Sequence, residues 1–132
     1  MLVDSELAGN TSPKGAGVFQ EDGEAAIRNS TFSSNQADLG GGIYNDAGVV
    51  TFDGCVFSNN SAIFDGGGLY NYGGDILATD SVFDSNTAGM QAGGVTLVGG
   101  VSTFDACEFF ANSSTNGSAI YANAFSEVTI SD

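Results

Sequence analysis

The side chains of this sequence that could do chemistry are mostly carboxylates. Sixteen Asp and Glu stand against two basic residues, Lys14 and Arg28, so the chain of 132 residues has a formal charge of −14, and it contains no His. Two carboxylates about 5 to 9.5 Å apart can hydrolyse a glycosidic bond, and carboxylates with Ca²⁺ and a base can cleave a uronate. The lack of His excludes a Ser-His-Asp triad and a His-bearing metal site.

The charge also bears on partners. A strongly acidic surface repels phosphate backbones and anionic lipid heads, so we expect no nucleic-acid partner. No apolar run has the length of a membrane-spanning helix, so we expect no membrane insertion. Residues Met1–Glu6 lack the basic start and apolar stretch of a signal peptide, and any targeting signal is expected outside this sequence.

The sequence repeats itself, and the repeat decides how the carboxylates are placed. The motif F-x-x-N recurs along the chain, with Leu7–Asn10 as a degenerate first copy. A second motif, glycines followed by an aliphatic residue, keeps step with it, as in Gly66–Tyr70. The Asn residues of the first motif are spaced by 25, 25, 26 and 26 residues: Asn10, Asn35, Asn60, Asn86 and Asn112. Such a period is the signature of a repeat architecture.

Each repeat is typical of short strands joined by bends. Alternating stretches such as Val49–Phe52 and Cys55–Phe57 are broken by Gly, Asn or Asp, and no ten-residue segment has helical periodicity. Three strands and three bends per repeat make one coil of a parallel β-helix, with coils stacked about 4.8 Å apart. We predict an all-β fold, a right-handed parallel β-helix of about five coils. It forms a single domain over 1–132, with repeats near 7–31, 32–56, 57–82, 83–108 and 109–132.

Stacking explains which residues recur. Three apolar columns should line the core: Leu7, Phe32, Phe57, Phe83, Phe109; Val18, Ile43, Leu69, Val95, Ile120; and Ile27, Phe52, Ala78, Phe104, Ile130. The Asn column should form a structural ladder, because each amide can satisfy its bend and bond to the Asn above and below. The glycines suit bends of positive φ or close approach. A phosphate-binding loop is not favoured at Gly40–Gly42 or Gly66–Gly68, since no Lys or helix start follows.

The paired motifs resemble the repeats of the chlamydial-type polymorphic outer membrane proteins. Phe57–Asn60 and Gly66–Tyr70 show the two motifs in full, and the resemblance runs from about Leu7 to Ile130. It implies a right-handed parallel β-helix displayed outside the cell. We therefore expect an extracellular or cell-surface protein with a noncatalytic structural or adhesive role.

A carbohydrate-binding or carbohydrate-modifying β-helix is the alternative, because pectate lyases, polygalacturonases and alginate epimerases are similar in architecture. Asp53 and Asp105 share an outward column, but Arg28 and Thr79 occupy other rungs of it, so the two carboxylates should lie about 10 Å apart. The other candidate acids fall in different columns: Asp38, Asp65, Asp80 and Asp84. We expect a solvated acidic coat, with no catalytic residue, cofactor or metal site.

A column of mostly aromatic residues follows the inward aliphatic row, so strand alternation directs it outward. Its aromatic members are a candidate binding stripe, because exposed rings at strand spacing suit sugar stacking or packing against a protein: Phe19, Tyr44, Tyr70 and Tyr121, with Thr96 between the last two. The alternative is a stripe hidden by a loop or a neighbouring chain. An ice-binding face is not favoured, because Ala26 and Leu77 interrupt the row of Thr residues.

The two cysteines share a column with Ser81 between them. Cys55 and Cys107 should therefore lie about 10 Å apart, too far for a disulfide with each other. We expect small inward side chains, and the alternative is a disulfide between chains.

Five N-x-[ST] sequons are present. Asn10 and Asn112 belong to the inward ladder and are expected to be inaccessible, whereas Asn29, Asn59 and Asn116 lie off it. These three are the candidate N-glycosylation sites.

The repeat leaves about six residues before Leu7 and two after Ile130, too few for polar caps. Unpaired strand edges at both ends would invite another β-element. We therefore expect copies of the chain or adjoining β-helix segments to stack end to end, as a subunit or segment of a surface fibre or filament, with glycans as a further possible partner. The acidic coat should discourage lateral clumping.

Overall fold

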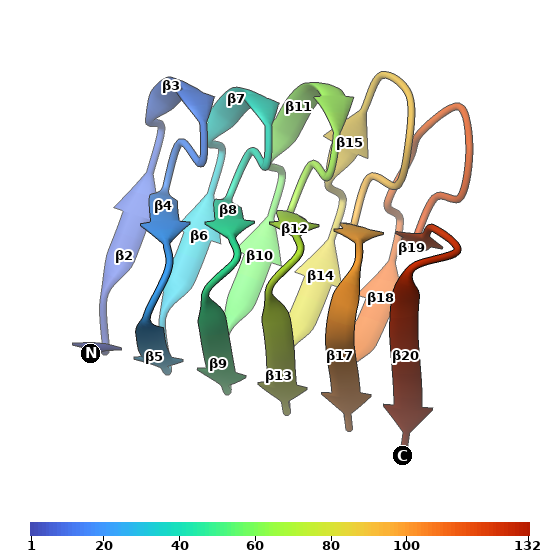
Figure 1. Ribbon diagram of the computed structural model, residues 1–132. Helices are drawn as coiled ribbons and strands as arrows, with labels where there is room; N and C mark the ends of the chain where they lie inside the picture. The colour runs from blue at the N-terminus through green and yellow to red at the C-terminus, as the bar shows by residue number, and fades with distance from the viewer.

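The chain winds into a solenoid of parallel β-strands without any helix (Figure 1). The computed structural model describes all residues from Met1 to Asp132. Its strands form four sheets, and in each sheet the neighbouring strands come from successive coils. The predicted all-β parallel solenoid of about five coils is confirmed.

The four sheets are named A to D in the order in which the chain first enters them. Sheet A holds β1 (Leu2–Val3), β5 (Glu24–Arg28), β9 (Val49–Asp53), β13 (Asp75–Thr79), β17 (Gly100–Asp105) and β20 (Ser126–Ser131). Sheet B holds β2 (Glu6–Ala8), β6 (Thr31–Ser33), β10 (Val56–Ser58), β14 (Val82–Asp84) and β18 (Glu108–Phe110). Sheet C holds β3 (Thr11–Lys14), β7 (Gln36–Leu39), β11 (Ser61–Asp65) and β15 (Thr87–Ala88). Sheet D holds β4 (Val18–Glu21), β8 (Ile43–Asp46), β12 (Leu69–Tyr72), β16 (Val95–Val98) and β19 (Ile120–Ala122).

The expectation of three strands per coil is wrong, because sheet C adds a fourth. Its strands begin directly after the ladder Asn, as β11 follows Asn60. Segments such as Gln36–Leu39 and Thr87–Ala88 are short and mostly polar or small, with few of the β-branched and aromatic residues that mark a strand. Pairing with the coils on either side, not local propensity, makes them strands.

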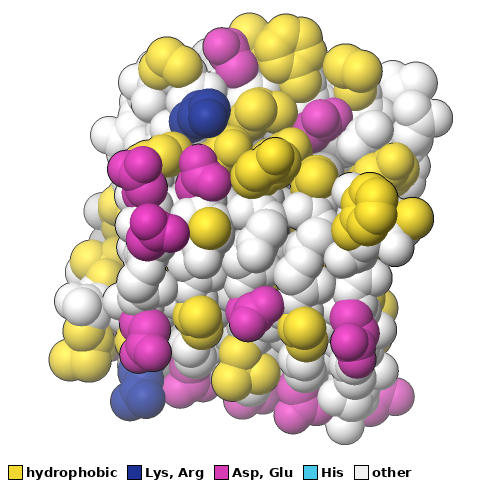
Figure 2. All heavy atoms as spheres, in the orientation of Figure 1, with side chains coloured by type: hydrophobic (Ala, Val, Ile, Leu, Met, Phe, Trp, Pro, Cys, Tyr) yellow, Lys and Arg dark blue, Asp and Glu magenta, His cyan; other side chains and the backbone are white.

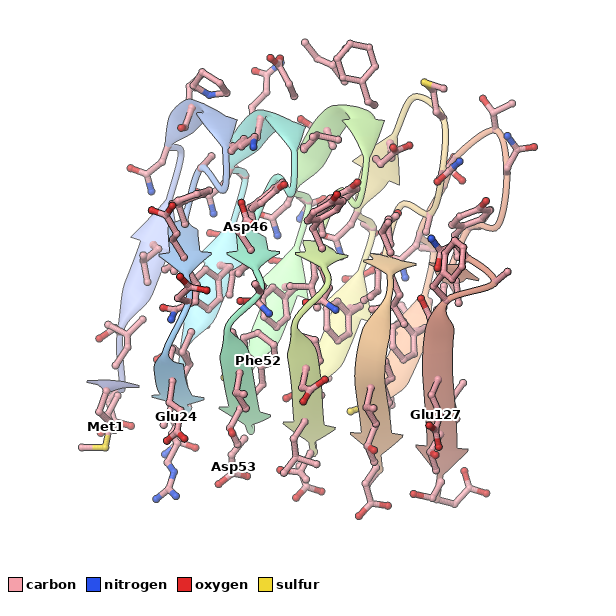
Figure 3. The ribbon with its side chains drawn as sticks, in the orientation of Figure 1. Met1, Glu24, Asp46, Phe52, Asp53 and Glu127 are labelled. Atoms are coloured by element: carbon pink, nitrogen blue, oxygen red, sulfur yellow. The ribbon has the colours of Figure 1, made fainter.

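The core is a stack of side chains in register from coil to coil. In sheet B, Phe57 lies opposite Phe32 and Phe83, and the ring centroids are 4.9 and 4.6 Å apart with nearly parallel planes. Phe52 and Phe104 of sheet A meet this stack edge-on. Figure 3 shows Phe52 directed inward while the next residue, Asp53, points away from the solenoid.

The three predicted apolar columns line this core in the inner coils. At the two ends of the solenoid, the residues of these columns are less buried. Leu7 and Phe109 are half-buried, and Ile130 in β20 is exposed, contrary to the expectation that it faces the core. Each inner ring is shielded by the coil on either side, so burial at the end coils depends on what lies beyond them.

Nearly every corner of the coil contains a residue with positive φ, and the corners at Asp22–Gly23 and Gly99–Gly100 contain two. The four corner columns are Asp4, Asn29, Gly54, Asp80, Ala106; Gly9, Ser34, Asn59, Ser85, Ala111; Gly15, Gly40, Gly66, Ala92, Gly117; and Asp22, Ala47, Gly73, Gly99. The left-handed conformation turns the chain sharply from one strand to the next, and Gly, Asn and Asp adopt it at least cost. This requirement explains why strands as short as three residues can follow one another.

Close packing of successive coils places a second demand on glycine. A Cβ built on Gly67 would lie 2.6 Å from the carbonyl oxygen of Gly93 and closer still to that of Thr87. Both contacts are backbone atoms of the next coil, which cannot move aside without breaking the stack.

We predict that Gly67→Ala lowers the free energy of unfolding by about 3 kcal/mol or more, because the methyl group has no space. Gly73→Ala is the matched control: its φ is +70° and no atom lies within 4 Å of the added Cβ. It should cost about 1 kcal/mol, from backbone strain alone. Urea denaturation followed by circular dichroism measures both, and equal losses would contradict the packing argument.

Candidate functional site

The candidate aromatic stripe lies on sheet D. Register pairs its members coil by coil, from Phe19 in β4 through Tyr44 and Tyr70 to Thr96 and Tyr121. The first three rings form one stack, with centroids 5.4 Å apart for Phe19 and Tyr44 and 5.1 Å apart for Tyr44 and Tyr70. The predicted column therefore exists as a continuous ring stack over three coils.

The expected exposed stripe is wrong at its centre, because Tyr44 and Tyr70 are 4% and 9% exposed. The column that ends sheet C lies beside it and covers it: Lys14, Leu39, Asp65 and Gln91. The Lys14 ammonium lies 4.6 Å from the centre of the Tyr44 ring, and Thr96 Oγ1 donates to the Gln91 carbonyl oxygen at 3.2 Å. Strand alternation does turn the rings away from the core, but the bend between sheets C and D folds over them. Phe19 is the exposed end of the stack.

This cover changes the acidity of two groups. Burial, helped by the nearby Tyr44 and Asp65, raises the pKa of the Tyr70 hydroxyl to about 12. Burial also raises the pKa of the Asp65 carboxyl, and a hydrogen bond of 3.0 Å from the Gln91 backbone N–H partly offsets the increase. Asp65 is thus a carboxylate that the fold holds in a poorly solvated position.

The structure places the five motif Asn residues in one hydrogen-bonded ladder. At each inner rung the backbone N–H and the side-chain Nδ2 donate to the Oδ1 of the next Asn; from Asn60 to Asn86 both distances are 3.0 Å. The second Nδ2 hydrogen reaches back to the preceding coil, from Asn60 to the Phe32 carbonyl oxygen at 2.9 Å. Each amide therefore joins three coils and leaves no donor unpaired.

A second, shorter amide ladder on sheet D was not predicted. Asn45 Nδ2 donates to Asn71 Oδ1 at 2.7 Å and to the Gly48 carbonyl oxygen at 2.8 Å, and both Asn side chains are buried. The column also contains Gln20 and Leu97, so it has no repeated motif. The alternation of side chains along a strand could have predicted this ladder. Asn45 lies two residues after the inward Ile43, so its side chain must also face the core.

The cysteine column alternates with serine. Cys55 is buried, Cys107 is half-buried, and both are free thiols. The Ser81 hydroxyl between them accepts from the Cys55 N–H at 3.1 Å and donates to the Thr79 carbonyl oxygen at 2.8 Å. Burial raises the pKa of both thiols, which disfavours the reactive thiolate. A disulfide between chains stays a prediction.

The candidate glycosylation residues Asn29, Asn59 and Asn116 are all exposed. Asn29 and Asn59 occupy left-handed corners, where the side chain leaves the solenoid. Asn10 is also exposed, contrary to the expectation that it is inaccessible, because it lies in the first coil. Its Nδ2 nevertheless donates to Asn35 Oδ1 at 3.0 Å. Glycan attachment stays a prediction.

The two carboxylates that share a column do not face each other. Thr79 lies between Asp53 and Asp105 in sheet A and donates to Asp53 Oδ1 at 3.2 Å. Ser131 donates to Asp105 Oδ1 at 2.7 Å. No three His, Cys, Asp or Glu side chains converge on a point where they could hold a metal ion, and no pocket indents the surface. None of the secondary structure is a long apolar helix of the kind that crosses a membrane.

Four parallel sheets wound about one axis, with amide and aromatic ladders in register, define a β-solenoid of the parallel β-helix class. A family model described as a right handed beta helix region matches residues 2–132. The chain belongs to this family, and the predicted right-handed β-helix is confirmed. No curated protein and no solved structure matches the chain.

We predict that Asn60→Asp makes the free energy of unfolding fall as pH rises. The carboxyl would lose the amide donors and lie against the Phe32 carbonyl oxygen and Asn86 Oδ1, so its pKa would be raised in the folded state. The variant should lose about 2 to 4 kcal/mol at neutral pH, and less below about pH 4, where the unfolded chain is also protonated. Asn59→Asp adds the same charge at an exposed neighbour and is the control. Equal pH profiles in urea titrations would contradict the ladder.

We also predict that Asp65→Asn raises the free energy of unfolding at neutral pH. The amide oxygen can still accept from the Gln91 N–H, while the cost of a poorly solvated charge disappears. Because the folded pKa is raised, the native chain loses stability relative to the variant from about pH 4 upward, until the folded carboxyl also ionises. Urea midpoints of both proteins between acidic and neutral pH measure this difference, with Asp38→Asn as control. A difference independent of pH would refute the assignment.

Proposed function

We propose that this chain is a noncatalytic rod segment of a structural or adhesive protein outside the cell. The observation that carries the proposal is that the hydrogen-bonded ladders run to both end coils. Each inner Asn accepts from the coil before it, and Asn10 in the first coil has no coil before it. At the other end, the Phe109 ring stacks on Phe83 at 4.8 Å and leaves its far face half-open. Both ends thus have the atoms needed to receive a further coil.

The strand register allows such an extension without a break. Leu2 of β1 and Ile130 of β20 lie in the same column of sheet A, at opposite ends. If a segment that resembles the chain from Ser5 onward followed Asp132, its first strand would therefore join sheet B and pair in register with β18. One contact opposes the junction: Glu6 and Glu108 share a column, so like charges would become neighbours. Salt should screen this repulsion.

The location and adhesive role have separate support. The motifs resemble those of the polymorphic outer membrane proteins, and the formal charge of −14 keeps such a rod from clumping laterally. Glycan binding by the aromatic stripe has less support, because Tyr44 and Tyr70 are covered. Phe19 is the ring of that stack with an exposed face, so a glycan array comparing the chain with Phe19→Ala tests this second role.

We predict that a fusion of residues 1–132 with a second copy of residues 5–132 forms one continuous rod. The junction would bury the open faces of the end coils, so the urea midpoint should rise above that of the single chain and small-angle scattering should show a particle of about doubled length. A fusion of the same halves through a flexible Gly-Ser linker is the control. If both fusions unfold at the midpoint of the single chain and bend at the junction, the rod proposal fails.

A further inference from the structure

The coils of this solenoid differ in length at the sheet C bend, and the difference brings apolar side chains to the surface. Strand β7 covers the sheet C bend with four residues, whereas β11 uses five between the same register partners. The extra residue forms a β-bulge between Ala62 and Asp65, and the next coil keeps the longer path. Bulges redirect side chains, and insertions in repeat proteins commonly build the binding face.

Three exposed apolar residues lie at this bulge and form what we call the bulge ridge. Ile63 is 55% exposed, Phe64 46% and Met90 50%. They are neighbours on successive coils, because the Met90 N–H donates to the Phe64 carbonyl oxygen at 2.8 Å. Figure 2 shows apolar side chains gathered along the edge of the molecule over β11 and the segment after β15. Other large apolar side chains are exposed too, such as Leu77 and Val101, but the bulge ridge brings an exposed aromatic ring and two exposed aliphatic chains together, which suits an interaction site.

The charge around the ridge selects the occupant. Asp38 lies on the preceding coil and Asp65 closes the bulge. Lys14 is the one basic residue in this part of sheet C, two coils before Asp65 in the same column, and the whole chain has a formal charge of −14. A second copy would bring the same negative charge and be repelled, whereas a cationic partner would be attracted over long range. We propose that the bulge ridge docks a protein segment whose apolar side chains are flanked by Lys or Arg. This inference rests on the adhesive part of the proposed function and names the chemistry of the partner.

The probe is a short synthetic peptide in which Lys alternates with Leu, compared with one in which Lys alternates with Ser. Isothermal titration calorimetry at about 0.15 M salt measures binding to the single chain. We expect the Lys-Leu peptide to bind with one site and the Lys-Ser peptide to bind at least about tenfold more weakly. Equal binding of the two peptides, or no binding of either, would overturn the proposal.

Variants locate the site. Phe64→Ser with Met90→Ser should weaken Lys-Leu binding at least about tenfold. The matched control is Leu77→Ser with Val101→Ser, because these sheet A residues are equally exposed, at 44% and 49%. An unchanged urea midpoint shows that each variant is folded, and Met90→Ser alone, expected to give a smaller loss, serves if the double variant unfolds.

Equal losses in the ridge and control variants would refute the site. Self-association that depends on Phe64 would instead make a second copy the occupant. The test uses the single chain, so its failure leaves the rod fusion unaffected.

Discussion

The structure depends on one constraint, that each coil lies in register on the next. Parallel pairing in register places equivalent residues of successive coils side by side. A residue type that recurs in a column must therefore pack well against another residue of the same type. An amide does so best, because it donates and accepts at once: at the inner rungs of the Asn ladder the Oδ1 accepts two hydrogen bonds from the preceding rung, and the Nδ2 donates to two coils. Phenylalanine does so by face-to-face stacking, at 4.6 Å between Phe57 and Phe83.

The repeat made much of this predictable, because a motif that recurs every 25 or 26 residues defines the columns directly. The Phe, Asn and Cys columns could be placed before any coordinates were known. The repeat did not predict the path that the backbone takes between these columns. Most strands of sheet C have too few β-branched or aromatic residues to be predicted, and the cover over Tyr44 depends on where the bend after Leu39 passes. Asn45 was missed for the opposite reason, since its column changes residue type from coil to coil.

The register also distinguishes the residues that stabilise the fold from the residues on which the fold does not depend. Columns that face inward are filled by their own copies, with rings at van der Waals separation, so the interior offers no room for a ligand. Departures from the repeat therefore matter most on the outside. The residues that lengthen a coil at Ile63 and Phe64 do so at an exposed bulge, and Phe125 projects from the longer connection between β19 and β20.

Charge acts on the same geometry in two directions. Along a column, like charges one coil apart repel at short range, so Glu6 and Glu108 would weaken a junction that the ladders favour. Around the rod, the same acids give a field that keeps parallel rods apart and draws in cations. End-to-end contact between rods can offset the repulsion between Glu6 and Glu108, because it continues the backbone, amide and aromatic ladders together. A lateral contact between copies has no such ladders to continue, so lateral binding favours a partner of opposite charge.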